Sequence, residues 1–173
     1  MIDAKKNTSF IAIAEKDKAY IDVTDNLTFL KDDSFIWTSE KDGYNHIYHY
    51  DKKGKLINQI TKGNWEVTNY YGYDSKKEKI YYQSVENGSI NRDVYSIDLD
   101  GTNKKRLTKT DGTSSAAFSA DFTYFINTFS SATTPPEYTL NKSATGNVIK
   151  SIKDNDKLAE KLTGYKTSKK EFS

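Results

Sequence analysis

The two histidines are the first residues in this chain that could do acid–base or metal chemistry. His46 and His49 lie three positions apart in His46-Ile47-Tyr48-His49-Tyr50-Asp51, a run that alternates like a β-strand. An odd separation on a strand points two side chains to opposite faces, which is poor geometry for a shared metal ion. No carboxylate is spaced to complete a zinc site or a catalytic triad with either ring. We therefore expect structural or solvated histidines, no metal site and no catalytic residue.

A second candidate is Asp98-Leu99-Asp100-Gly101-Thr102-Asn103, which has the form of the front half of a calcium loop. The glutamate expected at the twelfth position of such a loop is absent, because Lys109 stands there. The equivalent turn earlier in the chain, Asp51-Lys52-Lys53-Gly54, has lysines where ligands are needed. A hairpin turn explains both segments, so the sequence predicts no metal and no cofactor.

Two residues beside strands could contact a partner. Trp65 could form an aromatic contact surface, but packing between neighbouring parts of the fold is favoured, because an aromatic ring buries a large apolar area. Arg92 could line an opening of the fold or pair with an acidic neighbour such as Asp93. A surface ion pair is the favoured interpretation of Arg92, and such a pair contributes little stability.

Two further segments have a binding interpretation and a structural one. Thr134-Pro135-Pro136-Glu137 could be a proline-rich ligand for a recognition module, but a rigid extended loop before a strand is favoured. The basic tail Lys166–Lys170 could bind phosphates or membranes. Because Thr167 and Ser168 break its positive run, a solvated linker is favoured.

The composition excludes several classes of protein. The 173 residues contain no cysteine, which excludes a disulfide scaffold and cysteine-ligated metals without fixing the compartment. The net charge of +2, from 26 basic and 24 acidic residues, argues against a dedicated nucleic-acid surface. No apolar run approaches the ~20 residues of a membrane span. The start, Met1–Lys6, has no apolar stretch typical of a signal peptide.

The elements that position these residues come from a repeat. Strand-like runs and turns recur in the same order in three copies, and the chain opens inside an earlier copy. Asp51, Asp98 and Asn141 occupy matched positions, which gives a period of roughly 40–50 residues, typical of propeller blades. The copies are Phe35–Thr61, Ile80–Thr108 and Phe125–Ile152.

A first strand precedes each copy, at Ala19–Val23, Trp65–Tyr70 and Ser114–Phe118, so that each blade has four antiparallel strands. Gly43, Gly54, Gly101 and Gly146 supply the turns between strands. The predicted fold is all-β: a partial β-propeller with about three complete blades, part of another blade and a short C-terminal helix. The predicted units are a partial blade at 1–15, complete blades at 19–61, 65–108 and 114–153, and a helix with a linker at 154–173.

Asp154 or Asn155 could cap the helix that ends near Leu162, and Gly164 lies beyond it as a stop. Three blades and a fraction cannot close a ring of the usual size, so the outer blades should expose faces made for burial. We expect this segment alone to be weakly stable or to self-associate.

Five stretches carry a resemblance to a known family: Asp25–Asp32, Phe35–Tyr48, Thr61–Val67, Asn91–Tyr95 and Lys169–Phe172. They resemble the dipeptidyl-peptidase IV family of prolyl oligopeptidase-type serine peptidases, in the C-terminal half of the family's N-terminal β-propeller domain. They cover almost the whole chain in the family's order. The tail through Phe172 is similar to the segment that leads into the family's α/β-hydrolase domain.

The resemblance implies that the parent enzyme removes dipeptides from N-termini with a Ser-Asp-His triad in the hydrolase domain. The G-x-S-x-G elbow of that domain is absent here, because Gly88-Ser89 and Gly112-Thr113-Ser114 lack its flanking glycines. The family's paired glutamates that hold the substrate amino group are absent too, since the sequence has no Glu-Glu pair. Catalytic, cofactor-binding and metal-binding residues are therefore all expected to be none in this segment.

The resemblance implies that this chain is a non-catalytic propeller segment, which gates access to a hydrolase domain and supports assembly of the enzyme. Its expected partners are that domain, a peptide substrate in the intact enzyme and a possible second copy, with no nucleic acid and no membrane span. A periplasmic or extracellular place is expected for the parent. The alternative is a stand-alone propeller scaffold that binds a protein or a glycan, and the neighbouring coding sequence would distinguish the two.

Overall fold

The computed structural model describes residues 1–3 and 7–163, and the predicted linker and basic tail at 164–173 lie outside that range. Three four-stranded antiparallel sheets, each with its strands in chain order, make up most of the described chain. They confirm the predicted all-β partial propeller. A two-stranded hairpin precedes them, formed by β1 (Ile2–Asp3) and β2 (Thr8–Ser9), and α1 (Asp156–Leu162) follows them.

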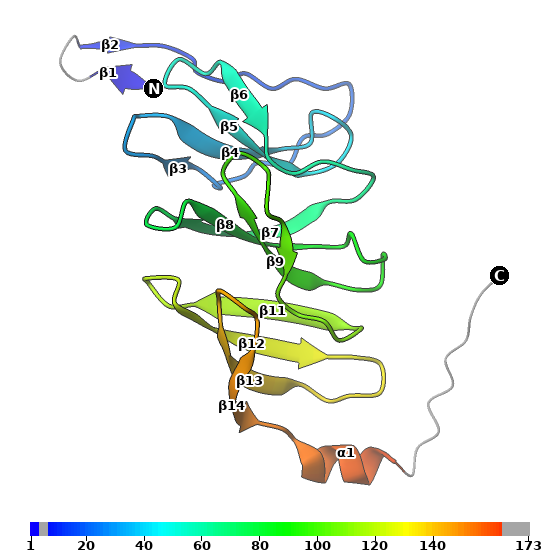
Figure 1. Ribbon diagram of the computed structural model, residues 1–173. Coiled ribbons are helices and arrows are strands. Elements are labelled where there is room, and N and C mark those ends of the chain that lie inside the picture. Colours follow the sequence, from blue (N-terminus) through cyan, green and yellow to red (C-terminus); the bar gives the residue numbers. More distant parts are fainter. Residues whose placement is uncertain (4–6, 164–173) are drawn as a thin grey trace.

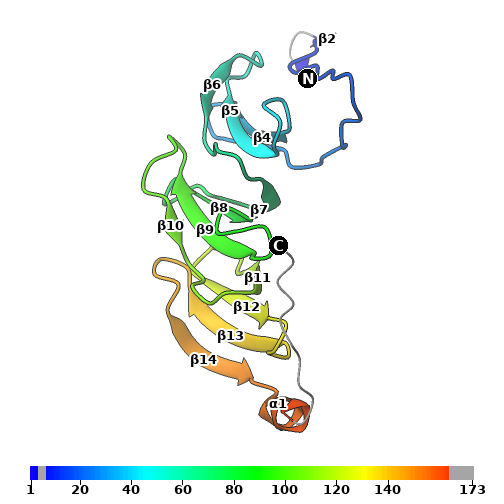
Figure 2. The same ribbon diagram turned by 90° about the vertical axis from the view of Figure 1, so that its right-hand side faces the viewer.

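Each sheet is one blade. The first blade is β3 (Thr28–Phe29), β4 (Phe35–Ser39), β5 (His46–Tyr50) and β6 (Leu56–Gln59). The second is β7 (Val67–Asp74), β8 (Lys79–Ser84), β9 (Asp93–Asp98) and β10 (Lys105–Arg106). The third is β11 (Thr113–Phe118), β12 (Tyr124–Ser130), β13 (Glu137–Lys142) and β14 (Val148–Lys153). The blades follow one another in a row, with the N-terminal hairpin at one end and α1 at the other (Figures 1 and 2).

The core lies between blades rather than within one blade. Ile36 and Ile47 of the first blade pack against Ile80 and Tyr82 of the second. On the other side of the second blade, a further cluster joins it to the third, through Tyr81, Val94, Leu107 and Phe125. Successive side chains of a strand point to opposite faces, so neighbours such as Tyr81 and Tyr82 serve two different joints. This explains why bulky residues fill both faces of the central strands.

A glycine in the turn before each blade's last strand allows the part of the chain that precedes the blade to approach closely. Gly54, Gly101 and Gly146 have φ of +84°, +86° and +79°, the left-handed region that favours glycine. A Cβ on Gly101 would stand 3.1 Å from the backbone oxygen of Ile60 in the preceding blade. A Cβ on Gly146 would overlap the backbone oxygen of Leu107. The predicted turn glycines are confirmed, and they also set the spacing between blades.

The predicted first strand at Ala19–Val23 is wrong. The inner edge of β4 pairs instead with β3, at Thr28 and Phe29, and an edge that is already paired cannot accept a second strand. Tyr20 and Val23 are 81% and 92% exposed. The segment reaches the blade through Thr24, whose hydroxyl lies 3.2 Å from that of Thr38. The other two first strands are present, as β7 and β11.

The third copy is also offset by one residue from its predicted alignment. The backbone N–H groups of Asp51, Asp98 and Lys142 each donate across the turn before the last strand, which makes Lys142, not Asn141, the equivalent of Asp98. The turn of the third blade contains one more residue than that of the second. The prediction matched Asn141 to Asp98 by side-chain type, and the true equivalent, Lys142, is the next residue along the chain.

The helix near the end is present, but its expected cap is not made by a side chain. Asn155 occupies the N-cap position with φ +59°, and no side-chain hydrogen bond caps the helix. The Asn155 amide instead donates to the backbone oxygen of Pro136. No residue of α1 is buried. Gly164, the predicted stop, lies outside the described residues.

Candidate functional site

Both histidines are built into the joints of the first blade. His46 is fully buried, and its ring nitrogens lie 3.1 Å from Thr61 Oγ1 and 3.0 Å from the Gly63 backbone oxygen. His49 Nε2 lies 2.9 Å from Ser34 Oγ, and burial lowers the pKa of the His49 imidazole. Within residues 1–3 and 7–163, no three His, Cys, Asp or Glu side chains gather where they could hold a metal ion. These contacts give both rings structural roles.

The loop with a calcium-like pattern uses its carboxylates to close its own turn. Asp100 Oδ1 accepts hydrogen bonds from the Thr102 backbone N–H at 2.8 Å and the Thr102 hydroxyl at 2.7 Å. Asp98 pairs with the Lys79 ammonium, and its other oxygen accepts from Asn103 Nδ2 at 2.7 Å. The hydrogen bond from Lys79 is the main reason that the pKa of Asp98 is lowered. The segment is a hairpin turn with its acidic groups already occupied.

Trp65 packs at the joint between the first and second blades, as the sequence predicts. Its ring meets the His46 ring edge-on at 4.8 Å between centroids and lies parallel to the Tyr82 ring at 6.5 Å. The Lys104 ammonium lies 5.4 Å from the Trp65 ring centroid, within cation–π range. Trp65 precedes β7 instead of starting it.

The predicted surface ion pair of Arg92 is wrong. No ion pair of Arg92 occurs in the part of the chain that the structure describes, and its backbone instead bridges to Thr113 of the next blade. Asp93 is fully buried and pairs with Arg106 Nη2 at 3.0 Å, while the Thr108 hydroxyl donates to Asp93 Oδ1 at 3.0 Å. Burial raises the pKa of the Asp93 carboxyl, against the opposite effects of Thr108 and Arg106. Sequence reasoning missed this pair, whose signal was two opposite charges on either side of one hairpin.

The proline-rich segment forms a loop between β12 and β13. The Ser131 hydroxyl accepts hydrogen bonds from the backbone N–H groups of Thr133, at 3.3 Å, and Thr134, at 3.1 Å. A groove of about 610 Å³ separates this loop from Ala159 and Leu162 of α1. The loop and the helix are joined by the bond from Asn155 to Pro136. The rigid-loop interpretation therefore agrees with the local hydrogen bonds.

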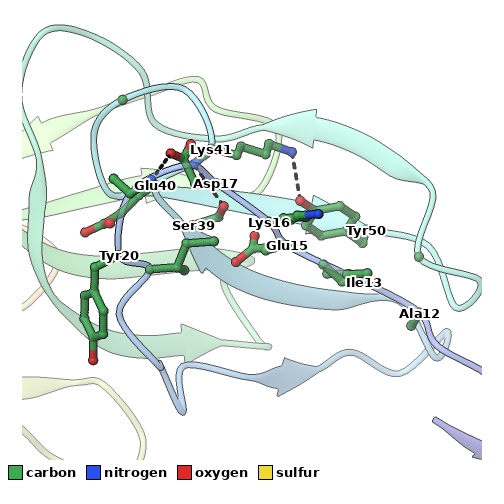
Figure 3. A pocket seen from close by; sticks show the side chains of 15 residues that line it. Ala12, Ile13, Glu15, Lys16, Asp17, Tyr20, Ser39, Glu40, Lys41 and Tyr50 are labelled. Carbon is green, nitrogen blue, oxygen red and sulfur yellow. Dashed lines mark hydrogen bonds between the residues drawn. The ribbon is translucent and has the colours of Figure 1, made fainter.

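A pocket of about 520 Å³ lies against the first blade, where the segment before β3 crosses it (Figure 3). Lys41 extends along its wall, with Nζ donating to the Tyr50 hydroxyl at 2.8 Å and lying 3.9 Å from the Tyr48 ring centroid. Acidic side chains from both walls, Glu15 and Glu40 among them, face the same space. The sequence analysis did not single out these residues, because they come from two segments with no shared motif.

This pocket can bind polar groups but lacks the parts of a nucleophilic site. Its lining residues contain no histidine, and its one serine, Ser39, accepts the backbone N–H of Lys41 at 3.2 Å. A serine nucleophile requires a base within hydrogen-bonding reach. The groups available are two ammoniums, three carboxylates and two phenols, which suit polar contacts: Lys16, Lys41, Glu15, Asp17, Glu40, Tyr20 and Tyr50.

Comparisons with known proteins agree with the propeller. The crystal structure of Porphyromonas gingivalis dipeptidyl peptidase 4 matches 99% of this chain and 24% of that chain, with 38% identity and a TM-score of 0.87. The structure of a putative dipeptidyl aminopeptidase IV from Bacteroides ovatus matches 74% of this chain with 22% identity and a TM-score of 0.63, which supports the fold alone.

Curated relatives give the same family by sequence. Dipeptidyl peptidase 4 of Trichophyton equinum is 33% identical over 140 residues, which is 80% of this chain and 18% of that protein. The probable dipeptidyl peptidase 4 of Aspergillus flavus is 30% identical over 139 residues. The chain thus spans about a fifth of the length of these relatives. Residues 1–136 match the family described as the dipeptidyl peptidase IV (DPP IV) N-terminal region, and the chain belongs to that family.

Proposed function

We propose that this chain is the non-catalytic propeller segment of a dipeptidyl-peptidase IV-like serine exopeptidase. In the proposed enzyme, a hydrolase domain elsewhere in the protein removes N-terminal dipeptides. The blades cover that domain, restrict entry to chain ends that fit through the propeller, and support assembly.

One observation carries this proposal: the blade architecture matches 24% of a dipeptidyl peptidase 4 chain at a TM-score of 0.87 and 38% identity. Proteins with this degree of similarity share fold, whereas function has to be argued from the site. The site supports a role in contact and access. Its wall presents Lys41, Tyr50 and acidic groups, without a nucleophile–base pair.

The gating role can be tested in the full-length protein that contains this chain. Trp65→Ala would loosen the joint between the first and second blades, where the indole contacts His46 and Tyr82. We expect kcat/KM for a long folded polypeptide with an N-terminal Gly-Pro to rise relative to kcat/KM for a Gly-Pro chromogenic dipeptide.

Ile90→Ala is the matched control, because the Ile90 side chain is 83% exposed in the loop between β8 and β9. That variant should keep the wild-type ratio of the two kcat/KM values. An unchanged ratio in Trp65→Ala would reject gating by the blades while leaving the family role intact. Absence of dipeptidyl-peptidase activity in the full-length wild type would reject the proposed function itself.

A further inference from the structure

The joint between the second and third blades differs in chemistry from the joint before it. In the second blade, the pairs Ile80–Ile97 and Tyr82–Tyr95 face the first blade and are at most 4% exposed. Because Lys142 is the equivalent of Asp98, the corresponding pairs of the third blade are Phe125–Asn141 and Asn127–Thr139. Three of four large apolar positions have therefore become small and polar.

These replacements leave a cavity. Its volume is about 300 Å³, and it lies between Leu107–Thr110 of the second blade and the face of the third blade that carries Asn127, Thr139 and Asn141. In the preceding joint, the stacked rings of Tyr82 and Tyr95, 5.5 Å apart, fill the equivalent place. The cavity opens to solvent on one side, where its lining residues Lys109, Asn147 and Val148 are exposed, so a small polar molecule can enter it.

One wall atom of this cavity lacks a partner. Asn127 is 8% exposed, and no group among residues 1–3 and 7–163 hydrogen-bonds to its buried Oδ1. Its neighbours are satisfied: Thr139 Oγ1 donates to Asn141 Oδ1 at 2.6 Å, and Asn141 Nδ2 donates to the Gly146 backbone oxygen at 3.0 Å. A buried acceptor without a donor costs free energy, and a bound donor would recover it.

We propose that this cavity between the second and third blades is a binding site for a small neutral polyol, of the size of one monosaccharide ring. A hydroxyl can donate to Asn127 Oδ1 and accept from a neighbouring donor, so a ring with several hydroxyls suits a wall of amides and hydroxyls. Glu137 and Lys109 also line the cavity and carry opposite charges, which favours a ligand without net charge. The Phe129 ring supplies an apolar surface for the C–H groups of the ring.

The test is a two-dimensional ¹H–¹⁵N NMR titration of the full 173-residue chain with glucose, galactose, N-acetylglucosamine and myo-inositol. At least one probe should saturate the amide shifts of Asn127 and Thr139, with a dissociation constant on the order of millimolar. Asn127→Tyr restores the ring present at Tyr82 and should abolish binding by filling the cavity. Asn127→Leu keeps the volume but removes the amide, and should weaken binding at least about tenfold.

Thr128→Val is the matched control, because Thr128 does not line the cavity and its side chain points to the opposite face of β12 from Asn127. It should bind as the wild type does. The proposal is overturned if none of the four probes saturates, which would leave only water in the cavity. It is also overturned if folded Asn127→Leu binds with unchanged affinity, or if the shifts centre elsewhere.

Discussion

At the residue scale, Asp93 anchors the start of β9 through a charge that is held out of water. Its carboxylate accepts a hydrogen bond from the Thr108 hydroxyl and forms an ion pair with the Arg106 guanidinium. With the Asn87 side-chain amide turned so that its oxygen faces Arg106, that oxygen accepts hydrogen bonds at 3.0 and 3.2 Å. A buried charge is tolerated only when it is paired and hydrogen-bonded, so these groups depend on one another.

We expect Asp93→Ala to lower the free energy of unfolding by about 2–3 kcal/mol, because it leaves Arg106 and Thr108 without their charged partner. Asp111→Ala is the control, since Asp111 lies 3.8 Å from Arg106 and is 84% exposed. That change should cost less than about 0.5 kcal/mol. Urea unfolding followed by circular dichroism measures both values. Equal losses in the two variants would show that the buried pair is not the anchor.

At the element scale, the turn glycines position each blade against its neighbour. Gly146 and Gly43 both have positive φ, +79° and +100°, but they differ in surroundings. A Cβ on Gly146 would overlap the Leu107 backbone, whereas a Cβ on Gly43 would meet no atom within 4 Å. Comparing alanine variants at these two positions therefore separates the cost of backbone strain from the cost of a clash between blades.

Gly43→Ala should cost about 1 kcal/mol of unfolding free energy, from left-handed strain alone. Gly146→Ala should cost at least about 1 kcal/mol more, because the blades must also move apart. Thermal and urea unfolding of the two variants measure the difference. If Gly146→Ala were no worse than Gly43→Ala, the turn would not set the spacing between blades.

Strands and turns can be predicted from the sequence where the pattern that forms them is local. The hairpin turn at Gly101 and the strands on either side follow from alternation and glycine placement alone. The strand at Ala19–Val23 failed because alternation does not reveal which strand already occupies the edge of β4. The Asp93–Arg106 pair and the Lys41 pocket were missed because each brings together groups that only the folded chain makes neighbours.

At the scale of the whole molecule, the end blades expose apolar surface. Tyr124 and Ile126, on the face of the third blade away from the second, are 43% and 41% exposed. At the other end, Ile11 is 80% exposed. Every residue of the last strand, β14, is exposed, so its edge is open to pairing. Repeat proteins need capping units to cover such faces.

We therefore expect the 173-residue chain alone to associate as its concentration rises. Light scattering over a dilution series should show a mass above 19.7 kDa that falls on dilution. The double variant Tyr124→Lys and Ile126→Lys should shift this series toward the monomer by placing charges on the exposed face. A wild-type monomer that persists at all concentrations would contradict the expectation.

The claim that the chain contributes blades and not catalysis is tested most directly by an activity assay on two proteins at equal molar concentration. The first is this chain alone, and the second is the natural full-length protein that contains it, both assayed with Gly-Pro p-nitroanilide. The account predicts turnover by the full-length protein, sensitive to a serine-directed inhibitor, and no turnover by the chain alone. Inhibitor-sensitive turnover by the chain alone, or none by the full-length protein, would contradict it.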